Sequence, residues 1–251
     1  MMKKITAIIP TLNEEIHIDE AIKSVGFADE IIVIDSFSSD KTLELAQKHN
    51  VKIIKRKFDD FSTQKNFAID QALHDWIYIL DADERVTAEV EKEILEAVEN
   101  PGKHVGFYVK RSFYLSGKKV KFGGFQRDKV IRLFLKEFCR YNGNHVHETI
   151  AANGELGFFR HKIDHYSYRN YDHYISKLNH YAALRAKQMQ SQGKTVNLYH
   201  ILIKPPVRFF VHYVVRLGFL DGFSGFLIAK THAYGVLTRY IKLWLFNQKI
   251  T

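Results

Sequence analysis

The first hundred residues alternate short β-branched segments with helical patterns, and this alternation constrains the fold more than any other feature. The strand-like segments read "KITAIIP", "EIIVIDS", "VKIIKRK" and "WIYIL". The intervening segments, "NEEIHIDEAIKSV", "SDKTLELAQKHN" and "STQKNFAIDQAL", carry apolar residues at helical spacing. Strands that alternate with helices of this length predict right-handed βαβ units and a mainly parallel sheet flanked by helices.

The pattern changes twice further along the chain. The segments "VGFYVKRSFYLSGKKVKFGGF" and "DKVIRLFLK" predict antiparallel strands, and from about residue 170 the pattern is helical to the end. Pro205 and Pro206 interrupt that helical pattern and predict a helix start or a bend. We therefore expect an α/β fold in three parts: residues 1–103 with the parallel sheet, 104–168 with an antiparallel extension, and 169–251 as a helical C-terminal region.

Length and cysteine content narrow the class of protein. A chain of 251 residues can bury a full core. Its one cysteine, Cys139, excludes an internal disulfide framework and fits a reducing compartment. The segment "MMKKITAIIPTLNEE" contains only a short apolar run, and no uncharged stretch is long enough to cross a bilayer. We expect a first strand there and not a signal peptide.

The positive charge is concentrated in the C-terminal part. Residues 1–150 hold 23 Lys and Arg against 24 Asp and Glu, whereas residues 151–251 hold 14 against 4. The second part also interleaves its basic residues with many aromatic residues. Such a segment can bind nucleic acid or an anionic membrane surface. Because RNA-binding signatures and zinc-finger spacing are missing from the sequence, we favour a membrane surface and expect no nucleic-acid partner.

Three polar clusters follow predicted strands: residues 10–15, 35–40 and 81–84. Ligands of open α/β sheets bind outside the carboxyl ends of the strands, where these clusters would meet. In the third cluster, Asp81 and Asp83 can share one Mg²⁺ or Mn²⁺ ion that also binds substrate phosphates. A solvated turn is the simpler alternative. The nucleophile loop of a haloacid-dehalogenase-type phosphatase is disfavoured by Arg85 and by the position of the motif after the fourth strand.

Four ordered segments, "AIIPTLNEE", "EIIVIDSFSSDKT", "QKNFAIDQAL" and "WIYILDADER", together resemble family 2 glycosyltransferases of the GT-A fold. The later segments "RLF", "HVHETI", "IDHYSYRNYDHYISKLNHYA" and "GFLDGFSGFLIA" are similar to the lipopolysaccharide-core branch. The resemblance implies an inverting transfer of a sugar from a nucleotide-diphosphate donor, with UDP-sugars favoured. It implies a lipid-linked or lipopolysaccharide-core acceptor.

The resemblance also implies roles for individual residues. Residues 1–103 would bind the donor, and residues 104–168 would bind the acceptor and carry catalysis. The bland alternatives are a helix N-terminus for residues 13–15, an N-cap for Asp40, and a solvated helix position for Lys65. Arg132 could instead complete an ion pair at a strand edge. Expected contacts to the nucleotide sugar are Pro10, Thr11, Asn13, Glu14, Asp35, Lys65, Asp81, Ala82, Arg132 and His147.

Inverting transfer requires a carboxylate that takes the proton of the acceptor hydroxyl. Glu148, in "GNHVHETI", is the expected base, and the other candidates before residue 160 are Asp128, Glu137 and Glu155. His147 would orient Glu148 or contact phosphate. A zinc site at His145 and His147 lacks a third ligand at suitable spacing.

The expected ligands of the Mg²⁺ or Mn²⁺ ion are Asp83, Asp81 and His165, although a purely structural His165 is an equal alternative. Glu84 is expected to be a loop or helix-start residue, with a contact to the donor sugar as an open alternative.

The C-terminal region alternates apolar and aromatic residues with Lys204, Arg208, Arg216, Lys230, Arg239 and Lys242. This pattern fits helices lying in a membrane interface, and ordinary packing against a core is the alternative. We expect a cytoplasmic protein that is peripheral at the inner face of the cell membrane. Two other functions stay open: a sugar-nucleotidyltransferase, although "PTLNEE" lacks the glycine-rich loop of that class, and a noncatalytic nucleotide- or glycan-binding module.

Overall fold

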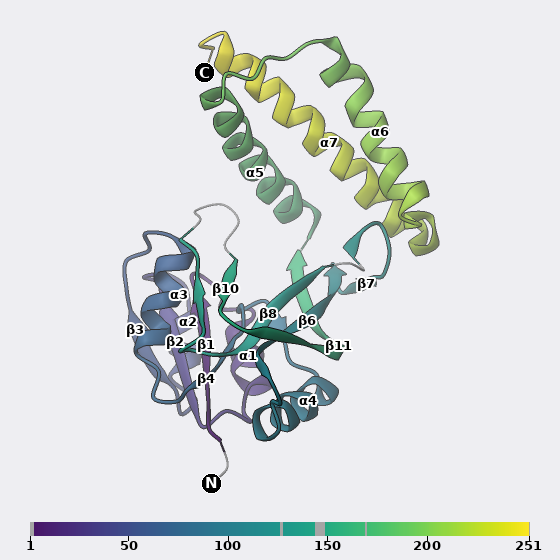
Figure 1. Cartoon of the computed structure of the whole chain (residues 1–251). Helices are drawn as coiled ribbons and strands as arrows, with labels where there is room; N and C mark the ends of the chain where they lie inside the picture. Colours follow the sequence, from purple (N-terminus) through teal and green to yellow (C-terminus); the bar gives the residue numbers. More distant parts are fainter. Residues whose placement is uncertain (1–2, 126–127, 144–148, 169, 251) are drawn as a thin grey trace. The chain divides into compact units, whose positions relative to one another are not determined.

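The computed structural model describes residues 3–125, 128–143, 149–168 and 170–250 (Figure 1). The chain forms two compact units. The first unit, here the sheet unit, contains residues 1–111 and 129–165. The second, here the helical unit, contains residues 112–128 and 166–251. The predicted division at residues 103 and 168 assigns functions to segments and stays a prediction.

The described residues form a nine-stranded sheet in the order β3-β2-β1-β4-β8-β6-β11-β5, with β7 paired to β6. Strands β3, β2, β1 and β4 are parallel, and β8 and β6 continue the sheet in antiparallel pairing. This mixed α/β sheet with flanking helices confirms the predicted fold class. The strands are β1 (Ile5–Thr11), β2 (Glu30–Asp35), β3 (Lys52–Lys55), β4 (Trp76–Ile79), β5 (Glu84–Arg85), β6 (His104–Leu115), β7 (Lys118–Val120), β8 (Lys129–Leu135) and β11 (Glu155–Tyr168), and a small separate sheet pairs β9 (Cys139–Tyr141) with β10 (Ile150–Ala152).

Both faces of the parallel strands are buried, which explains their nearly continuous apolar sequences. Along β1, Ala7 and Ile9 belong to one core, and Ile8 belongs to the other. The first core also contains the apolar faces of α1 and α4, and the second contains the apolar face of α3. The helices among the described residues of this unit are α1 (Ile18–Ser24), α2 (Thr42–Ala46), α3 (Phe61–Asp70) and α4 (Ala88–Glu99).

Helix α1 is shorter than the sequence pattern predicts, because residues 13–17 form a separate turn. The backbone N–H groups of His17 and Ile18 both donate to the Glu14 carbonyl. Asn13 adopts a left-handed backbone with φ of 55°, which an asparagine tolerates better than most residues. Residues 13–15 are therefore not the first turn of the helix.

Asp40 is not the N-cap of α2. Its carboxylate accepts hydrogen bonds from the backbone N–H groups of Thr42 and Glu15, at 3.0 and 3.1 Å. It thus ties the segment after β1 to the segment after β2.

The helical unit is built on two long helices, α5 (Tyr171–Ser191) and α7 (Gly222–Asn247). Between them lie η2 (Tyr199–Ile203), α6 (Lys204–Phe210), η3 (Val211–Val215) and η4 (Gly218–Asp221). Its cores join side chains of α5 and α7, such as Ala186 with Val236 and Tyr174 with Ile228. Pro205 and Pro206 occupy the first turn of α6, where proline is tolerated, as the sequence predicts.

Glycines allow η4 to lie directly against α7. A Cβ atom on Gly225 would approach the Gly218 carbonyl oxygen to 1.8 Å, so only glycine fits there. Asp221, at the junction, accepts hydrogen bonds from the backbone N–H groups of Lys121 and Phe122. The segment "GFLDGFSGF" is therefore a packing and tethering motif and not merely a turn.

Within the described residues, no single helix is long and apolar enough to cross a membrane. The segments 199–215 and 218–247, which are bent by 72°, reach the length and composition of a span only when they are taken as a pair.

Candidate functional site

The candidate site lies where the parallel strand order reverses. From β1 the sheet extends to β2 on one side and to β4 on the other. Open α/β sheets bind ligands at the carboxyl ends of the strands that flank such a point. Thr11 ends β1, and Asp81 follows β4. The Thr11 side chain is buried, and its hydroxyl has no hydrogen-bond partner within the described part of the chain.

Hydrogen bonds fix the segment after β1 against the segment after β2. Asn13 Oδ1 accepts from the Ser39 N–H at 2.8 Å, and the Asn13 N–H donates to Ser38 Oγ at 2.9 Å. The fully buried Asp35 accepts from both the N–H and the hydroxyl of Ser38. The Glu14 N–H donates to the Thr42 hydroxyl at 2.8 Å. Ser38 thus joins Asn13, after β1, to Asp35, at the end of β2.

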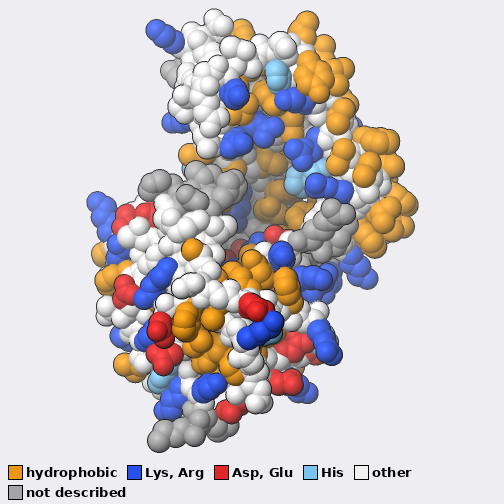
Figure 2. All heavy atoms as spheres, in the orientation of Figure 1, with side chains coloured by type: hydrophobic (Ala, Val, Ile, Leu, Met, Phe, Trp, Pro, Cys, Tyr) orange, Lys and Arg blue, Asp and Glu red, His pale blue; other side chains and the backbone are white. Residues whose placement is uncertain are grey.

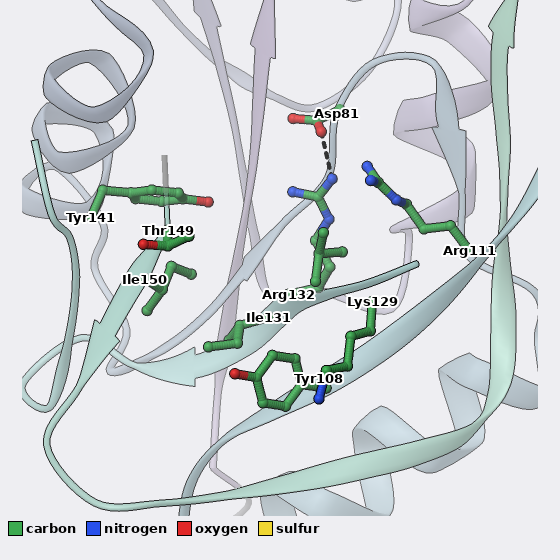
Figure 3. Close-up of a pocket in the computed structure, with 10 residues that line it drawn as sticks. Asp81, Tyr108, Arg111, Lys129, Ile131, Arg132, Tyr141, Thr149 and Ile150 are labelled. Carbon is green, nitrogen blue, oxygen red and sulfur yellow. Dashed lines mark hydrogen bonds and ion pairs between the residues drawn. The ribbon is translucent and has the colours of Figure 1, made fainter. Parts of the chain in front are cut away.

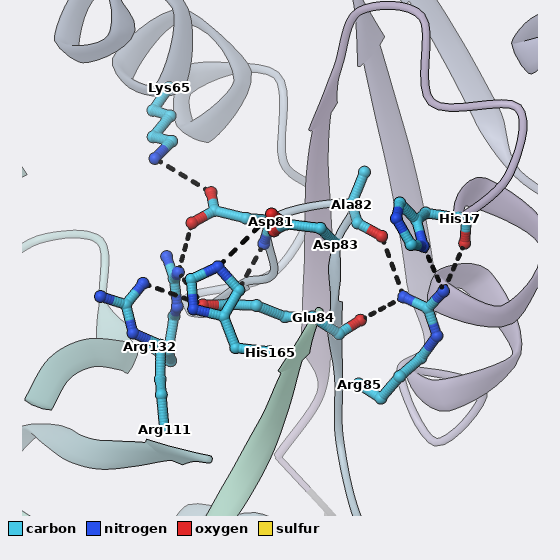
Figure 4. A network of polar contacts seen from close by, with 10 residues as sticks. All are labelled: His17, Lys65, Asp81, Ala82, Asp83, Glu84, Arg85, Arg111, Arg132 and His165. Carbon is cyan, nitrogen blue, oxygen red and sulfur yellow. Dashed lines mark hydrogen bonds and ion pairs between the residues drawn. The ribbon is translucent and has the colours of Figure 1, made fainter. Parts of the chain in front are cut away.

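Asp81 is held between two buried cations. Lys65 Nζ lies 3.2 Å from Asp81 Oδ1, and the Arg132 guanidinium binds Oδ2 (Figure 4). Lys65 and Arg132 are each only 3% exposed. Lys65 is therefore not the solvated helix lysine of the bland alternative, and Arg132 does form a carboxylate pair.

Glu84 extends this network into the interior. Its side chain is fully buried, and its Oε1 accepts from Arg132 Nη2 at 2.6 Å and from Arg111 Nη1 at 3.2 Å. Its Oε2 accepts from the Asp81 N–H at 3.2 Å. The expectation that Glu84 is a loop or helix-start residue is wrong, because Glu84 lies on β5 and links two strand arginines.

The electrostatics of the network keep Asp81 and Arg132 ionised. Burial alone would raise the pKa of Asp81, but the charges of Arg132, Lys65 and Arg111 outweigh it and hold that pKa well below its usual range. Burial would lower the pKa of Arg132, yet Asp81 and Glu84 hold it well above its usual value. By formal charge, the described members Lys65, Arg111, Arg132, Asp81 and Glu84 sum to +1.

Arg85 fixes the turn that carries the acidic residues. Its Nη1 donates to the carbonyls of Ala82 and Glu84, at 2.9 and 2.6 Å. Its Nη2 donates to the His17 carbonyl at 2.9 Å, which ties the turn to the start of α1 (Figure 4). The Ala82 side chain is buried, so its predicted substrate contact stays a prediction.

Asp83 and His165 meet because β5 pairs antiparallel with β11, with His165 opposite Glu84. Asp83 Oδ2 lies 3.4 Å from His165 Nε2, and both side chains are partly exposed. Asp81, by contrast, contacts cations. No group of three or more His, Cys, Asp or Glu side chains that could hold a metal ion occurs among the residues that the structure describes.

A cavity of about 320 Å³ opens beside Asp81 and Arg132 (Figure 3). Among its described lining residues, Arg111, Lys129 and Arg132 are basic and Asp81 is acidic. The cavity can therefore accept an anionic or strongly hydroxylated ligand. The other lining residues are Tyr108, Val130, Ile131, Tyr141, Thr149 and Ile150.

Comparison with known sequences shows which family the chain matches. Residues 6–154, more than half of the chain, match the family described as glycosyl transferase family 2. The chain belongs to glycosyltransferase family 2. This membership favours the glycosyltransferase interpretation over a sugar-nucleotidyltransferase.

Two relatives align with this glycosyltransferase over nearly its whole length. An uncharacterised glycosyltransferase of Rickettsia felis is 30% identical, over 96% of this chain and 90% of the relative. The lipopolysaccharide core biosynthesis glycosyltransferase LpsC of Rhizobium meliloti is also 30% identical, over 93% of this chain and 90% of the relative. The predicted resemblance, including its lipopolysaccharide-core branch, is confirmed.

Among solved structures, the glycosyltransferase is similar to glucosyl-3-phosphoglycerate synthase of Mycobacterium tuberculosis in complex with Mn²⁺, UDP and phosphoglyceric acid. The identity is 21%, the overlap covers 44% of this chain and 43% of that chain, and the TM-score is 0.37. The overlap is thus confined to less than half of each chain.

Two predicted site residues of the glycosyltransferase, His147 and Glu148, lie outside the described residues, and their roles stay predictions. Lys65, Asp81 and Arg132 are brought into one network. The remaining predicted contacts are Pro10, Thr11, Asn13, Glu14 and Asp35, which lie at the ends of β1 and β2 or directly after β1.

The donor set at Asp83 fits a hard divalent cation. Asp83 offers the carboxylate oxygen that Mg²⁺ and Mn²⁺ prefer, and His165 offers an imidazole beside it. Proteins commonly hold Mg²⁺ with one or two carboxylates and complete its coordination with substrate phosphates and water. An ion at this pair would need such oxygens from the substrate.

Arg111 and Glu84 are the network members that the sequence analysis missed. Arg111 lies on β6, and Arg132 lies on β8 within the apolar segment "VIRLFL". An arginine inside a buried strand needs a carboxylate partner, and this requirement was the available signal. Glu84, the common partner of Arg111 and Arg132, lies 27 residues from Arg111 and 48 residues from Arg132 in sequence. Local sequence patterns do not connect residues so far apart.

Proposed function

We propose that this glycosyltransferase transfers a sugar, with inversion, from a nucleotide-diphosphate donor to a lipopolysaccharide-core or lipid-linked acceptor. The observation that carries the proposal is the buried network of Lys65, Asp81, Arg132, Glu84 and Arg111 at the carboxyl end of β4. A donor of this kind brings a diphosphate, and the network offers a net positive charge beside an open cavity.

The carboxylates of the network position its cations. Asp81 holds Lys65 and Arg132, and Glu84 holds Arg132 and Arg111, so the cations keep fixed positions before substrate binds. Preorganised cations stabilise the charge that develops on a leaving diphosphate without reorganising during the reaction. We assign Lys65 to the diphosphate for this reason.

In the transfer step, the acceptor hydroxyl oxygen attacks the anomeric carbon. The bond from that carbon to the nucleoside diphosphate breaks, and its electron pair leaves with the diphosphate. The hydroxyl proton passes to a carboxylate base, for which we propose Glu148. The Glu148→Gln variant should lose turnover and keep donor binding, and near-full turnover would contradict the assignment.

Asp83 and His165 would hold a Mg²⁺ or Mn²⁺ ion, with Asp81 as a further predicted ligand. When bound, the ion would supply neutralising charge at the diphosphate. Metal dependence can be checked by removing divalent ions with a chelator and restoring Mn²⁺ or Mg²⁺ in the transfer assay.

Support for the acceptor comes from two sources. LpsC of Rhizobium meliloti bears the name of a lipopolysaccharide core biosynthesis enzyme. The helical unit also exposes a large apolar surface along residues 198–226 (Figure 2). Phe223 is 78% exposed and Leu198 is 74% exposed, values that are unusual for such large apolar side chains.

A helix with an exposed apolar face beside basic residues fits a membrane interface. We therefore propose that the protein is cytoplasmic and docks peripherally on the inner face of the cell membrane, where a lipid-linked acceptor is available.

A donor screen tests the proposed activity. UDP-, GDP- and ADP-sugars are each incubated with protein, Mn²⁺ and membrane lipid extract, and both sugar transfer and slow donor hydrolysis are measured. We expect one nucleotide class, UDP, to be consumed. The Asp83→Ala variant serves as the control that should stay folded and lose turnover. If no nucleotide sugar is bound or consumed, the proposed function is wrong.

A further inference from the structure

The cavity beside Asp81 has a second side, which Tyr108 and Lys129 form. Figure 3 places Asp81 on one side of the cavity and places Tyr108 and Lys129 on the opposite side. Tyr108 belongs to β6, and Lys129 is the first residue of β8. A cavity with two distinct sides can bring two reactants together, so the side away from Asp81 is available for a second ligand.

Tyr108 is one member of an aromatic pair. Its ring stacks on the ring of Phe158 on β11, with the centroids 5.0 Å apart and an angle of 19° between the planes. Phe158 is 58% exposed, which is unusual for phenylalanine. The face of an aromatic ring is negative and attracts positively polarised C–H groups. Because a sugar ring presents such C–H groups on its faces, the pair can hold a sugar.

Lys129 adds a positive charge to the aromatic pair. Its Nζ lies 4.5 Å from the ring centroid of Tyr108 and 4.8 Å from that of Phe158. Within the described part of the chain, its ammonium group contacts these two rings and no carboxylate. Arg132, by contrast, is paired with carboxylates. Lys129 can therefore bind an anion without breaking an ion pair of the described residues.

A second lysine stands directly opposite Lys129. The antiparallel pairing of β6 with β8 places Lys110 opposite Lys129. Residues in such positions project from the same face of a sheet, where like charges are unfavourable. Lys110 is exposed, and none of the described carboxylates forms an ion pair with it. An anion bound beside the two lysines would relieve their repulsion.

We infer that this side of the cavity binds the acceptor sugar, and that the acceptor sugar carries a carboxylate or phosphate group. The inference rests on the proposed function, because it assigns the acceptor of the same transfer. The sugar ring packs on Tyr108 and Phe158, and its anionic group binds the ammonium group of Lys129.

The charge of the sugar decides how tightly it binds. A neutral sugar gains only the contact with the rings, whereas a charged sugar also gains a charge-assisted contact with Lys129. One contact of this kind corresponds to about tenfold in affinity. The site therefore selects charged sugars over neutral sugars of the same size.

Ligand-observed NMR with the 251-residue protein tests the inference and needs no catalytic activity. The probes are glucose 6-phosphate, methyl glucuronide and the neutral methyl glucoside, each titrated with UDP and Mn²⁺ present to occupy the diphosphate site. We expect the wild-type protein to bind the two charged sugars about tenfold more tightly than the neutral sugar. This preference should disappear in Lys129→Gln and persist in Lys129→Arg, which keeps the charge.

The matched control is Lys92→Gln, which removes an exposed lysine of α4 and should keep the preference. Phe158→Ala removes the exposed ring and should weaken the binding of charged and neutral sugars alike. Equal binding of charged and neutral sugars by the wild-type protein overturns the inference, and so does a lack of binding by every probe. A Lys129→Gln protein that keeps the preference overturns it as well.

Inorganic phosphate is titrated in the same way to separate a sugar site from a simple anion site. We expect it to bind more weakly than glucose 6-phosphate, because it makes no contact with the rings. If inorganic phosphate binds as tightly as glucose 6-phosphate, the site recognises an anion alone and the assignment of a sugar is wrong.

Transfer kinetics supply a second readout, with membrane lipid extract as the acceptor. Lys129→Gln should raise about tenfold the amount of extract that gives half-maximal rate, and it should leave the KM for the nucleotide sugar unchanged. A change in the donor KM with no change for the extract would place Lys129 at the donor and overturn the inference.

Donor binding is measured separately by calorimetry with UDP and Mn²⁺. Absence of nucleotide binding contradicts the proposed function and leaves the charge preference among the sugar probes in place. Loss of that preference together with intact nucleotide binding contradicts the acceptor assignment only. The two failures are therefore distinguishable.

Discussion

The two units of the molecule surround their arginines with different partners. In the sheet unit, Lys65, Arg132 and Arg111 are each paired with Asp81 or Glu84. In the helical unit, Arg208 and Arg216 share a neutral histidine, and the described residues place no carboxylate beside Arg208. The carboxylate pairs hold the cations of the sheet unit in fixed positions before a ligand binds.

The difference has consequences for stability and for binding. Removing a member of the paired network should unfold or disable the protein, because its partner is left buried and uncompensated. Replacing Arg208 in the helical unit should instead relieve repulsion with Arg239 and Arg216. The two outcomes can therefore be separated by measuring the stability of the variants.

The largest effect is expected for Glu84→Ala. This change leaves Arg132 and Arg111 without their fully buried carboxylate, and it should lower the free energy of unfolding by about 3–5 kcal/mol. The matched control is Glu155→Ala, which breaks an exposed pair with Lys103 and should cost about 0–1 kcal/mol. Urea unfolding measures both, and equal losses would contradict the role given to Glu84.

The next effect concerns pH and the helical unit. The pKa of His212 falls from 6.5 in the unfolded chain to about 4 in the folded protein, because of burial and of Arg216 and Arg208. Between these values the unfolded chain binds more protons, so stability is full above pH 6.5 and is lost as the pH falls toward 4. The shift corresponds to roughly 3 kcal/mol.

His232, stacked on His212, acts in the same direction, since its pKa is lowered to about 3 by burial and by His212, Arg208 and Arg216. Thermal unfolding monitored by circular dichroism across this range checks the prediction. His212→Gln should flatten the pH dependence, and an unchanged slope in that variant would count against it.

A third effect is expected on catalysis. Lys65→Met removes a buried cation at nearly constant volume and should lower kcat about a hundredfold, the usual cost of one preorganised electrostatic contact. Lys92→Met, on the exposed face of α4, is the control and should keep full activity. Steady-state transfer rates decide the outcome. A Lys65→Met enzyme with near wild-type kcat would remove Lys65 from the site.

The smallest effect should differ in sign between the units. Arg208→Gln relieves repulsion with Arg216 and Arg239 and should raise stability without ligand by about 0.2–0.5 kcal/mol. Arg140→Gln breaks the exposed pair with Asp70 in the sheet unit and should lower stability by at most about 1 kcal/mol. Precise denaturant titrations of both variants measure this. A destabilised Arg208→Gln protein would show that Arg208 stabilises the fold.

The order of strands and helices was predictable because each element has its own periodic pattern. The acidic residues after β4 were predictable as a site because parallel strands deliver their carboxyl ends to one edge. Glu84 was not, because its burial depends on β5 pairing with β11, 80 residues later, and on arginines of β6 and β8. Local patterns contain no information about such pairings.

The C-terminal region also shows what local sequence patterns cannot predict. Its basic and apolar composition was visible in the sequence, and its helices were predicted. The sequence alone did not show that Lys204, Arg208 and His212 face α7 while Val207 and Phe210 face solvent. A helical pattern gives the two faces, and only the packing against α7 decides which one is buried.

The central claim is that the edge beside Asp81 and Asp83 is a metal-assisted nucleotide-diphosphate site. Calorimetric titration of UDP into the 251-residue protein, with and without Mn²⁺, tests it most directly, and Asp83→Asn serves as the comparison. We predict saturable UDP binding that requires Mn²⁺ and that weakens at least about tenfold in Asp83→Asn. UDP binding that is indifferent to both Mn²⁺ and Asp83, or no nucleotide binding at all, would contradict the account.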